Sequence, residues 1–363
     1  HGALFTAARA LPPEADTRRG EALSRAFAQA AARPRRFSFF KQDAPWPGHD
    51  WAARALSDVA GAEAALFTAG RAIDPELAGS ALNLLAPRSG SGMARGGLGA
   101  LGGALAACAT AAGAELRLGA EVSEVRQGKS RVTGLLLGDG SEIAASAIIS
   151  TLDLRRSFLS LFKWSALPQP LIVRIGAFRM TGSTARLLLA LEKPPRLDAA
   201  PLILDPAPAA SLAAWRDAAI PEQPPLMLRL VTTSDPALAP PGAGIVTVTL
   251  GCIPHRLFDG PWTEGKRDLL RSRVLAMMEP TLGALRPLAA KLIVPPDIEE
   301  TLGLTDGDLD GGEIAPDQML NFRPGPRTPL AGFYLAGPSS MAGPLATCAG
   351  GWVAARALLA DRA

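Results

Sequence analysis

The sequence predicts a mixed α/β (α+β) fold with two parts, one of helices and short strands and one of an antiparallel sheet with helices. Apolar residues between Glu21 and Ala32 recur at the spacing of one helix face. Short strand-like segments follow residue 119, and further ones, separated by proline-rich turns, follow residue 151. The chain has 363 residues, 48% of them hydrophobic, which suffices for one large or two ordinary domains.

The composition excludes several classes of protein. A net charge of +3 is too small to indicate a nucleic-acid-binding protein. The three cysteines lie far apart without a CxxC motif, which argues against a zinc site or a disulfide framework and favours a reducing compartment. The spacing of His1, His49 and His255 predicts no metal site. No apolar run reaches the ~18 residues that span a bilayer, and the start at His1 indicates a processed chain or part of a longer product.

Residues 1–90 are predicted to form a helical N-terminal region, with later helices at Trp51–Phe67 and Pro75–Leu85. Before these helices, the segment Arg33–Trp46 places basic residues beside phenylalanines and a tryptophan. Such a segment is either a loop whose aromatic side chains turn into the core or a contact with a membrane surface. Both interpretations remain open, and the loop is the simpler one.

A GxGxxG pattern at Gly97, Gly99 and Gly102 suggests a dinucleotide-binding turn. That turn needs a buried strand directly before it, whereas residues 87–95 are rich in glycine, serine and arginine. We therefore reject this interpretation and expect a helix that ends near Ala112. Three β-rich segments follow it, at 120–125, 131–140 and 143–150, and a tight turn at residues 138–140 predicts a hairpin.

From about residue 151 to residue 300, the pattern becomes that of an antiparallel sheet covered by helices. His255 follows Pro254 in the loop after the third strand, so we expect a surface or hydrogen-bonding role for it rather than catalysis. The three strands and the long helix are predicted at Arg186–Leu191, Leu226–Val231, Ile245–Leu250 and Trp262–Met278.

The C-terminal segment is predicted to place backbone N–H groups around a ligand. Phe333–Ala336 is a short buried strand, a turn of small residues follows it, and an alanine-rich helix extends to Leu359. Because the first N–H groups of a helix have no partner within the helix, a strand, a small turn and a helix start can face a bound group.

Position by position, this segment resembles the last cofactor-contacting segment of the phytoene-desaturase-like flavin oxidoreductases, which include the carotenoid desaturases and share the FAD-dependent amine-oxidase fold. Residues 96–150 and 303–324 resemble the same family. The matching positions in the C-terminal segment are Tyr334, Leu335, Gly337, Gly343, Gly351, Ala354, Ala355 and Arg356.

The resemblance implies an incomplete FAD-binding Rossmann-like domain of the glutathione-reductase type, formed by residues 91–155 and 300–363. Residues 156–299 then form a substrate-type domain. No catalytic residue is predicted. If FAD is retained, the residues next to it are Val122, Tyr334, Gly337, Gly343 and Thr347. For Val122, a core strand position is the alternative. The residues implied on the substrate side are Gly97, Leu98 and Arg323.

The chain departs from the family in three ways. No strand with a GxGxxG turn and an acidic partner occurs in residues 1–95, so the unit that holds the pyrophosphate of FAD is missing. Gly311 stands where many members have histidine. The C-terminal turn also lacks the glycines, histidine and proline that the family usually has, at Ser339, Met341, Ala342, Pro344 and Leu345.

Two interpretations remain. In the preferred one, the chain is a non-catalytic structural or binding subunit without FAD, held by other protein subunits on the cytoplasmic side and associated with a membrane through that complex. In the alternative, it is an FAD-dependent desaturase or isomerase that acts on an apolar, polyene-like molecule such as a carotenoid, and the missing half is supplied elsewhere.

Overall fold

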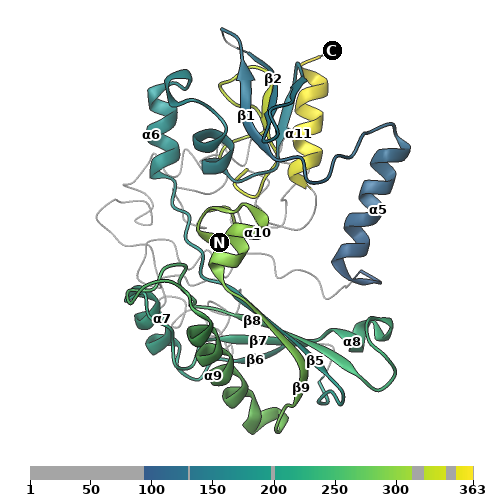
Figure 1. The fold of residues 1–363 in the computed structure, drawn as a ribbon, viewed down its shortest axis with the longest axis vertical. Helices are drawn as coiled ribbons and strands as arrows, with labels where there is room; N and C mark the ends of the chain where they lie inside the picture. Colours follow the sequence, from purple (N-terminus) through teal and green to yellow (C-terminus); the bar gives the residue numbers. More distant parts are fainter. Residues whose placement is uncertain (1–93, 130, 198–200, 313–322, 341–348, 363) are drawn as a thin grey trace, which may run out of the picture.

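The computed structural model describes five stretches of the chain, at 94–129, 131–197, 201–312, 323–340 and 349–362. The expected N-terminal helices and the segment Arg33–Trp46 lie outside these residues. Figure 1 shows two lobes, one containing β1, β2, α6 and α11 and the other containing a second sheet with α7 and α9; α10 lies between them. None of the described helices has the length and apolar character needed to cross a membrane.

The described part of the chain begins with α5 (Gly97–Ala111), which confirms the helix expected there. All three glycines of the GxGxxG pattern lie within this helix rather than in a turn before it, unlike the first glycine of a dinucleotide-binding turn. The predicted hairpin is also confirmed. It belongs to an antiparallel sheet in the order β1–β2–β3, with strands at Val122–Gln127, Val132–Leu137 and Glu142–Ala144.

A parallel pair of strands joins the middle of the chain to its C-terminal segment. β4 (Ile148–Ser150) pairs with β10 (Phe333–Leu335), which confirms the strand predicted there. The helix α11 (Ala349–Ala360) follows, and its Ala354 and Ala357 pack against Tyr334 of β10. Residues far apart in the sequence therefore meet in one small sheet, whose two strands end at the same edge.

Three phenylalanines form the centre of the first lobe's core. The ring of Phe333 makes edge-to-face contacts with Phe158 and Phe162, at centroid distances of 5.4 and 5.0 Å. The cluster around them continues through η4 (Arg156–Ser160) and past α6 (Gln169–Ala177) to Met180. The first buried residue of the second core is Ala185, so the chain passes from one core to the other between Met180 and Ala185.

The second lobe contains an antiparallel sheet in the order β6–β7–β8–β5–β9. The three strands predicted in this region are confirmed, and two further ones were not expected. The strands are β5 (Ala185–Leu191), β6 (Leu202–Leu204), β7 (Leu226–Leu230), β8 (Gly244–Leu250) and β9 (Pro287–Ile293). β6 has three residues, and β9 contains alanines and a lysine, which favour strands little, so both lacked a clear signal.

The predicted long helix is α9 (Glu264–Leu282), which covers one face of this sheet. Thr263 caps its start by accepting a hydrogen bond from the Lys266 N–H at 3.4 Å. Its buried Leu270, Val274 and Met278 share one hydrophobic cluster with the inward side chains of β5, β7 and β8. Three shorter helices complete the lobe and its connection, at α7 (Pro208–Arg216), α8 (Val231–Ser234) and α10 (Pro295–Leu302).

Candidate functional site

The carboxyl ends of β4 and β10 meet at a closely packed turn of the first lobe. The Ala336 N–H donates to the Ser150 carbonyl at 2.8 Å, which continues the pairing by one residue. A β-carbon on the following Gly337 would overlap the Leu152 carbonyl oxygen and lie 2.7 Å from that of Thr151. Only glycine allows the chain to leave β10 this close to the backbone after β4. Ligands of open α/β sheets bind at this edge, so we take it as the candidate site.

Ser339 and Ser340 come shortly after this glycine, and their hydroxyl groups differ in whether they have a hydrogen-bond partner. Both are buried. The Ser339 hydroxyl accepts a hydrogen bond from the Leu154 N–H at 3.0 Å, which fixes the turn to the first lobe. The Ser340 hydroxyl oxygen has no hydrogen-bond partner among the described residues, and it faces Gly350 in the first turn of α11. A buried polar atom without a partner is unfavourable, so this hydroxyl is suited to hydrogen-bond a group bound at the turn.

The loop 307–312 packs against the same turn. Gly311 has φ of +60°, and a β-carbon there would lie 2.6 Å from the Ser339 nitrogen. The histidine that the related family often has at this position therefore does not fit against the Pro338–Ser339 peptide of this chain. The absence of that histidine and the altered sequence of the turn are therefore two parts of one change, because residue 311 and the turn pack against each other.

The buried Asp308 carboxylate stabilises this loop through hydrogen bonds with backbone N–H groups. It accepts hydrogen bonds from the N–H groups of Thr181 at 3.1 Å, Gly312 at 3.0 Å and Asp310 at 2.9 Å. Burial, and then the neighbouring Asp310 carboxylate, raise the pKa of Asp308 to about 7. The three N–H donors lower the pKa of Asp308, but by less than burial and Asp310 raise it. The loop therefore contains a carboxyl group that titrates near neutral pH.

Arg323, which the sequence placed on the substrate side, connects the loop to the turn. Its buried guanidinium donates to the carbonyl oxygens of Gly312 at 2.6 Å, Pro338 at 2.7 Å and Asp310 at 3.3 Å. It also lies over the Phe178 ring, 5.9 Å from the ring centre. All three acceptors are backbone groups, so Arg323 positions the candidate site.

Tyr334, predicted beside the cofactor, directs its side chain toward α11. Its hydroxyl donates to the Asp361 carboxylate at 2.9 Å, and burial is the first cause that raises the pKa of Tyr334. Val122 begins β1, is half-buried and pairs with Leu137. The turn residues Gly343 and Thr347 lie outside the described residues.

The two other residues predicted on the substrate side lie at the start of α5. Gly97 is the first residue of the helix, and the Leu98 side chain is 73% exposed. The N–H of the preceding Gly96 donates to the Asp235 carboxylate, which attaches the start of α5 to the second lobe. The structure therefore does not bring Gly97 and Leu98 into contact with the turn after β10.

A cluster of polar side chains that the sequence did not predict links the two lobes. His255 lies 2.7 Å from Glu299 through its Nε2 and 3.9 Å from Asp306 through its Nδ1. Arg156 of η4 donates to the other Glu299 oxygen at 2.9 Å. One ligand atom from each of His255, Glu299 and Asp306 lies within 4.8 Å of the others, as in a metal site. Because Arg156 already supplies a cation to Glu299, we interpret the group as a polar cluster built around the Arg156–Glu299 ion pair.

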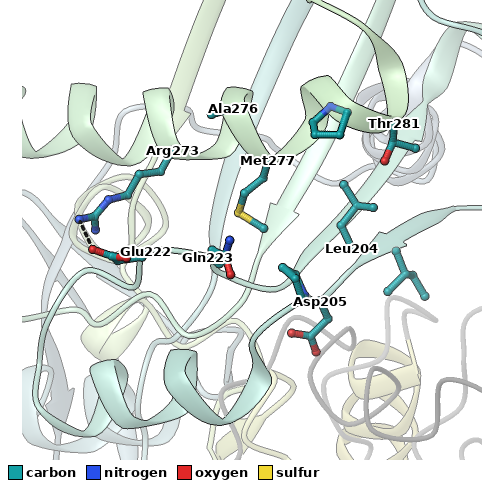
Figure 2. Close-up of a pocket in the computed structure, with 11 residues that line it drawn as sticks. Leu204, Asp205, Glu222, Gln223, Arg273, Ala276, Met277 and Thr281 are labelled. Atoms are coloured by element: carbon teal, nitrogen blue, oxygen red, sulfur yellow. Dashed lines mark ion pairs between the residues drawn. The ribbon is translucent and has the colours of Figure 1, made fainter.

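A pocket of about 770 Å³ lies on the outer side of the second lobe, against α9. Figure 2 shows Arg273 and Glu222 paired at one end and Asp205 at the other, with Met277 between them. None of the residues predicted as site residues lines this pocket. It is therefore separate from the turn after β10.

Similarity to known proteins identifies the family. The family described as flavin containing amine oxidoreductase matches residues 62–357. The pyridine nucleotide-disulfide oxidoreductase domain-containing protein 2 of Rattus norvegicus is 28% identical over 270 residues, which are 67% of this chain and 46% of that protein. A phytoene desaturase (lycopene-forming) of Paracoccus sp. is 28% identical over 265 residues, 70% of this chain and 52% of that enzyme. The chain thus spans about half the length of the curated relatives it matches.

Solved structures share the fold at low sequence identity. An oxidoreductase from Methanosarcina mazei covers 92% of this chain and 72% of its own, with a TM-score of 0.56 and 14% identity. Putrescine oxidase bound to putrescine covers 93% of this chain and 74% of its own, with a TM-score of 0.53 and 15% identity. The resemblance to the desaturase-like proteins is thereby confirmed, and because the family match extends over most of its length, the chain belongs to the flavin-containing amine oxidoreductase family.

Proposed function

We propose that the chain forms the flavin-ring and substrate side of an FAD-dependent oxidoreductase of the desaturase or isomerase type. The observation that carries this proposal is the buried Ser340 hydroxyl without a partner at the turn between β10 and α11. The altered turn suggested that the chain binds no cofactor. Membership of a flavin-protein family favours bound FAD instead. When bound, FAD supplies the redox chemistry, and this chain holds and orients the substrate.

The described residues fit one end of FAD. The Ser340 hydroxyl, the backbone after Gly337 and the first turn of α11 would hold the flavin end, since they converge at the carboxyl edge of β4 and β10. Arg323 and Asp308 would keep this turn in place through backbone contacts. The described residues contain no glycine-rich strand-to-helix turn for the pyrophosphate, so residues outside them, or another chain, hold that part. As part of this proposal, the complete FAD-binding domain has the glutathione-reductase type of fold.

The substrate is proposed to have a large apolar part. One relative is a phytoene desaturase that forms lycopene, and its name specifies a polyene product. In the first lobe, the described residues of the candidate turn, Gly337, Pro338, Ser339 and Ser340, are all uncharged types. A site of this kind suits an apolar body next to the flavin ring.

A non-catalytic subunit is the second candidate, and α5 is the observation that favours it. This helix has 15 residues, none of them buried, and exposes Leu98, Leu101 and Leu105. An exposed apolar helix of this length is typical of a surface that another polypeptide or segment covers. Under this proposal, the chain is kept for the surface it offers to other subunits, including a complex at the cytoplasmic side of a membrane.

The cofactor content of the native full-length protein distinguishes the two candidates. We expect flavin absorption in the purified protein and recovery of FAD after denaturation, identified by mass spectrometry. A Gly337→Ala variant should lose FAD, because the new β-carbon moves the turn, whereas Gly351→Ala, at an open position of α11, should retain it. A colourless native protein from which no flavin is released would instead support the non-catalytic subunit.

A further inference from the structure

The face of the five-stranded sheet opposite α9 carries two arginines on the strands that flank β8. Arg186 of β5 pairs with Thr249 of β8, and Arg229 of β7 pairs with Thr247 of the same strand. Directly paired residues, and residues two apart on a strand, point to the same side of a sheet. Both arginines therefore lie on one face, diagonally across β8, while Leu187 and its neighbours face α9.

The described strand residues give this face a basic character. The register adds Lys291 of β9, which is paired with Leu188, to the same side. Among the described residues of the five strands, none on this face is aspartate or glutamate. The charge of Lys291 interacts with the Asp297 carboxylate, although both oxygens of Asp297 accept hydrogen bonds from Arg267, at 2.6 and 2.7 Å. Arg186 and Arg229 have no salt bridge with any carboxylate in the described part of the chain.

The Arg186 end of the sheet lies at the junction of the lobes. Four residues before it, a β-carbon on Gly182 would overlap the Asp306 carbonyl oxygen in the segment that follows α10. Thr181 is held by Asp308 of the loop that packs on the candidate turn. The basic face therefore starts beside the segments that support the proposed flavin-side turn, and Arg229 lies farther out along the sheet.

The two guanidinium groups are close enough to affect each other. Desolvation, and secondly repulsion from Arg229, lower the pKa of Arg186 although part of its side chain reaches solvent. Two like charges held together without a counter-charge are unfavourable, and a bound anion relieves that repulsion.

Apolar side chains accompany the arginines on this face. Leu188, Met227 and Ile245 alternate with the basic residues and are half-buried. Apolar surface next to paired guanidinium groups matches a molecule with a hydrocarbon body and an anionic group at one end.

From this arrangement, we infer that Arg186 and Arg229 bind a carboxylate or phosphate group of an otherwise apolar ligand on the face of the sheet opposite α9. The inference rests on the proposed function, because it specifies the substrate of the same enzyme as an acidic apolar molecule. It also argues against a protonated amine as substrate, since this face would repel it.

Binding of chain-length-matched probes to the native full-length protein tests the inference without any turnover. Decanoate, decyl phosphate, decanol and decylamine are compared by isothermal titration calorimetry. We expect both anions to bind more tightly than decanol, decylamine to bind most weakly, and anion binding to weaken as sodium chloride is added. The stronger of the two anions identifies the head group as a carboxylate or a phosphate.

Arg186→Gln and Arg229→Gln should each weaken binding of the preferred anion at least about tenfold and leave decanol unchanged. Arg286→Gln is the matched control, because this exposed arginine precedes β9 and lies outside the basic face. Equal affinity for the anions and decanol, anion binding insensitive to salt, or unchanged binding by both variants would overturn the inference. The salt dependence is measured on the unaltered protein, so it tests the inference even if a variant fails to fold.

The outcomes of the two proposals can be told apart. A protein that contains FAD but binds decanoate and decanol equally contradicts only the anionic ligand. A protein that binds the anions but contains no flavin contradicts only the proposed oxidoreductase function.

Discussion

Gly337 lies so close to Leu152 that any β-carbon at position 337 would overlap the Leu152 carbonyl oxygen. This contact joins the end of β10 to the segment after β4, and it sets the path of the turn that we propose for the flavin. We expect Gly337→Ala to lower the free energy of unfolding by at least about 2 kcal/mol, because the two backbones must separate. Thermal unfolding measures this change.

Gly351→Ala is the control for that substitution. No atom lies within 4 Å of a β-carbon at position 351, and the residue is exposed within α11. Replacing glycine by alanine inside a helix should raise stability by about 0.5–1 kcal/mol. Equal unfolding temperatures for the two variants would contradict the close packing assigned to Gly337.

The buried Asp308 carboxyl predicts a loss of stability as the pH rises. Its pKa is raised from 3.8 to about 7 in the folded protein, so its contribution is fully present below about pH 4 and is lost as the pH rises through about 7. The greatest slope from one such group is about 1.4 kcal/mol per pH unit. Asp308→Asn should remove this component from the stability measured by chemical denaturation between pH 4 and pH 8. A variant with the same pH dependence as the native protein would refute the assignment.

Arg323→Lys tests whether the guanidinium positions the turn. Lysine has a single ammonium group and cannot span the carbonyls of Gly312, Pro338 and Asp310 with the geometry that Arg323 uses. We expect a loss of about 2–4 kcal/mol in the free energy of unfolding. Arg362→Lys, at an exposed residue that contacts the Ser146 hydroxyl, should change stability by less than about 0.5 kcal/mol. Similar losses in both variants would count against a special role for Arg323.

Tyr334→Phe separates a structural role from a cofactor-binding role. The variant loses the hydrogen bond to Asp361, so stability should fall by about 1 kcal/mol in thermal unfolding. FAD content should stay unchanged, because the hydroxyl faces the end of α11. Loss of FAD at retained stability would show that Tyr334 contacts the cofactor after all.

Much of the fold could be predicted because local pattern and tertiary environment agree. β5, β7 and β8 are rich in leucine or valine and lie between prolines or glycines, and all three were found. β9 was missed because its alanines and lysine carry a weak strand signal, and it forms only by pairing with β5. β10 and α11 were predicted from the apolar residues of the strand and the alanine-rich segment that follows it.

The site was predicted only in part, because its remaining features depend on tertiary contacts. Nothing near His255 in sequence indicated Glu299, since α10 brings that carboxylate from a distant segment. Arg186 and Arg229 each interrupt an apolar strand, which was a usable signal. That they share a face, however, follows only from the strand order and register.

The most direct test of the central claim is the cofactor content of the purified native full-length protein. Absorption in the flavin region is recorded, and any released cofactor is identified by mass spectrometry together with the intact mass of the polypeptide. The account predicts FAD at close to one molecule per chain. A colourless protein that releases no flavin, even after incubation with added FAD, would contradict it.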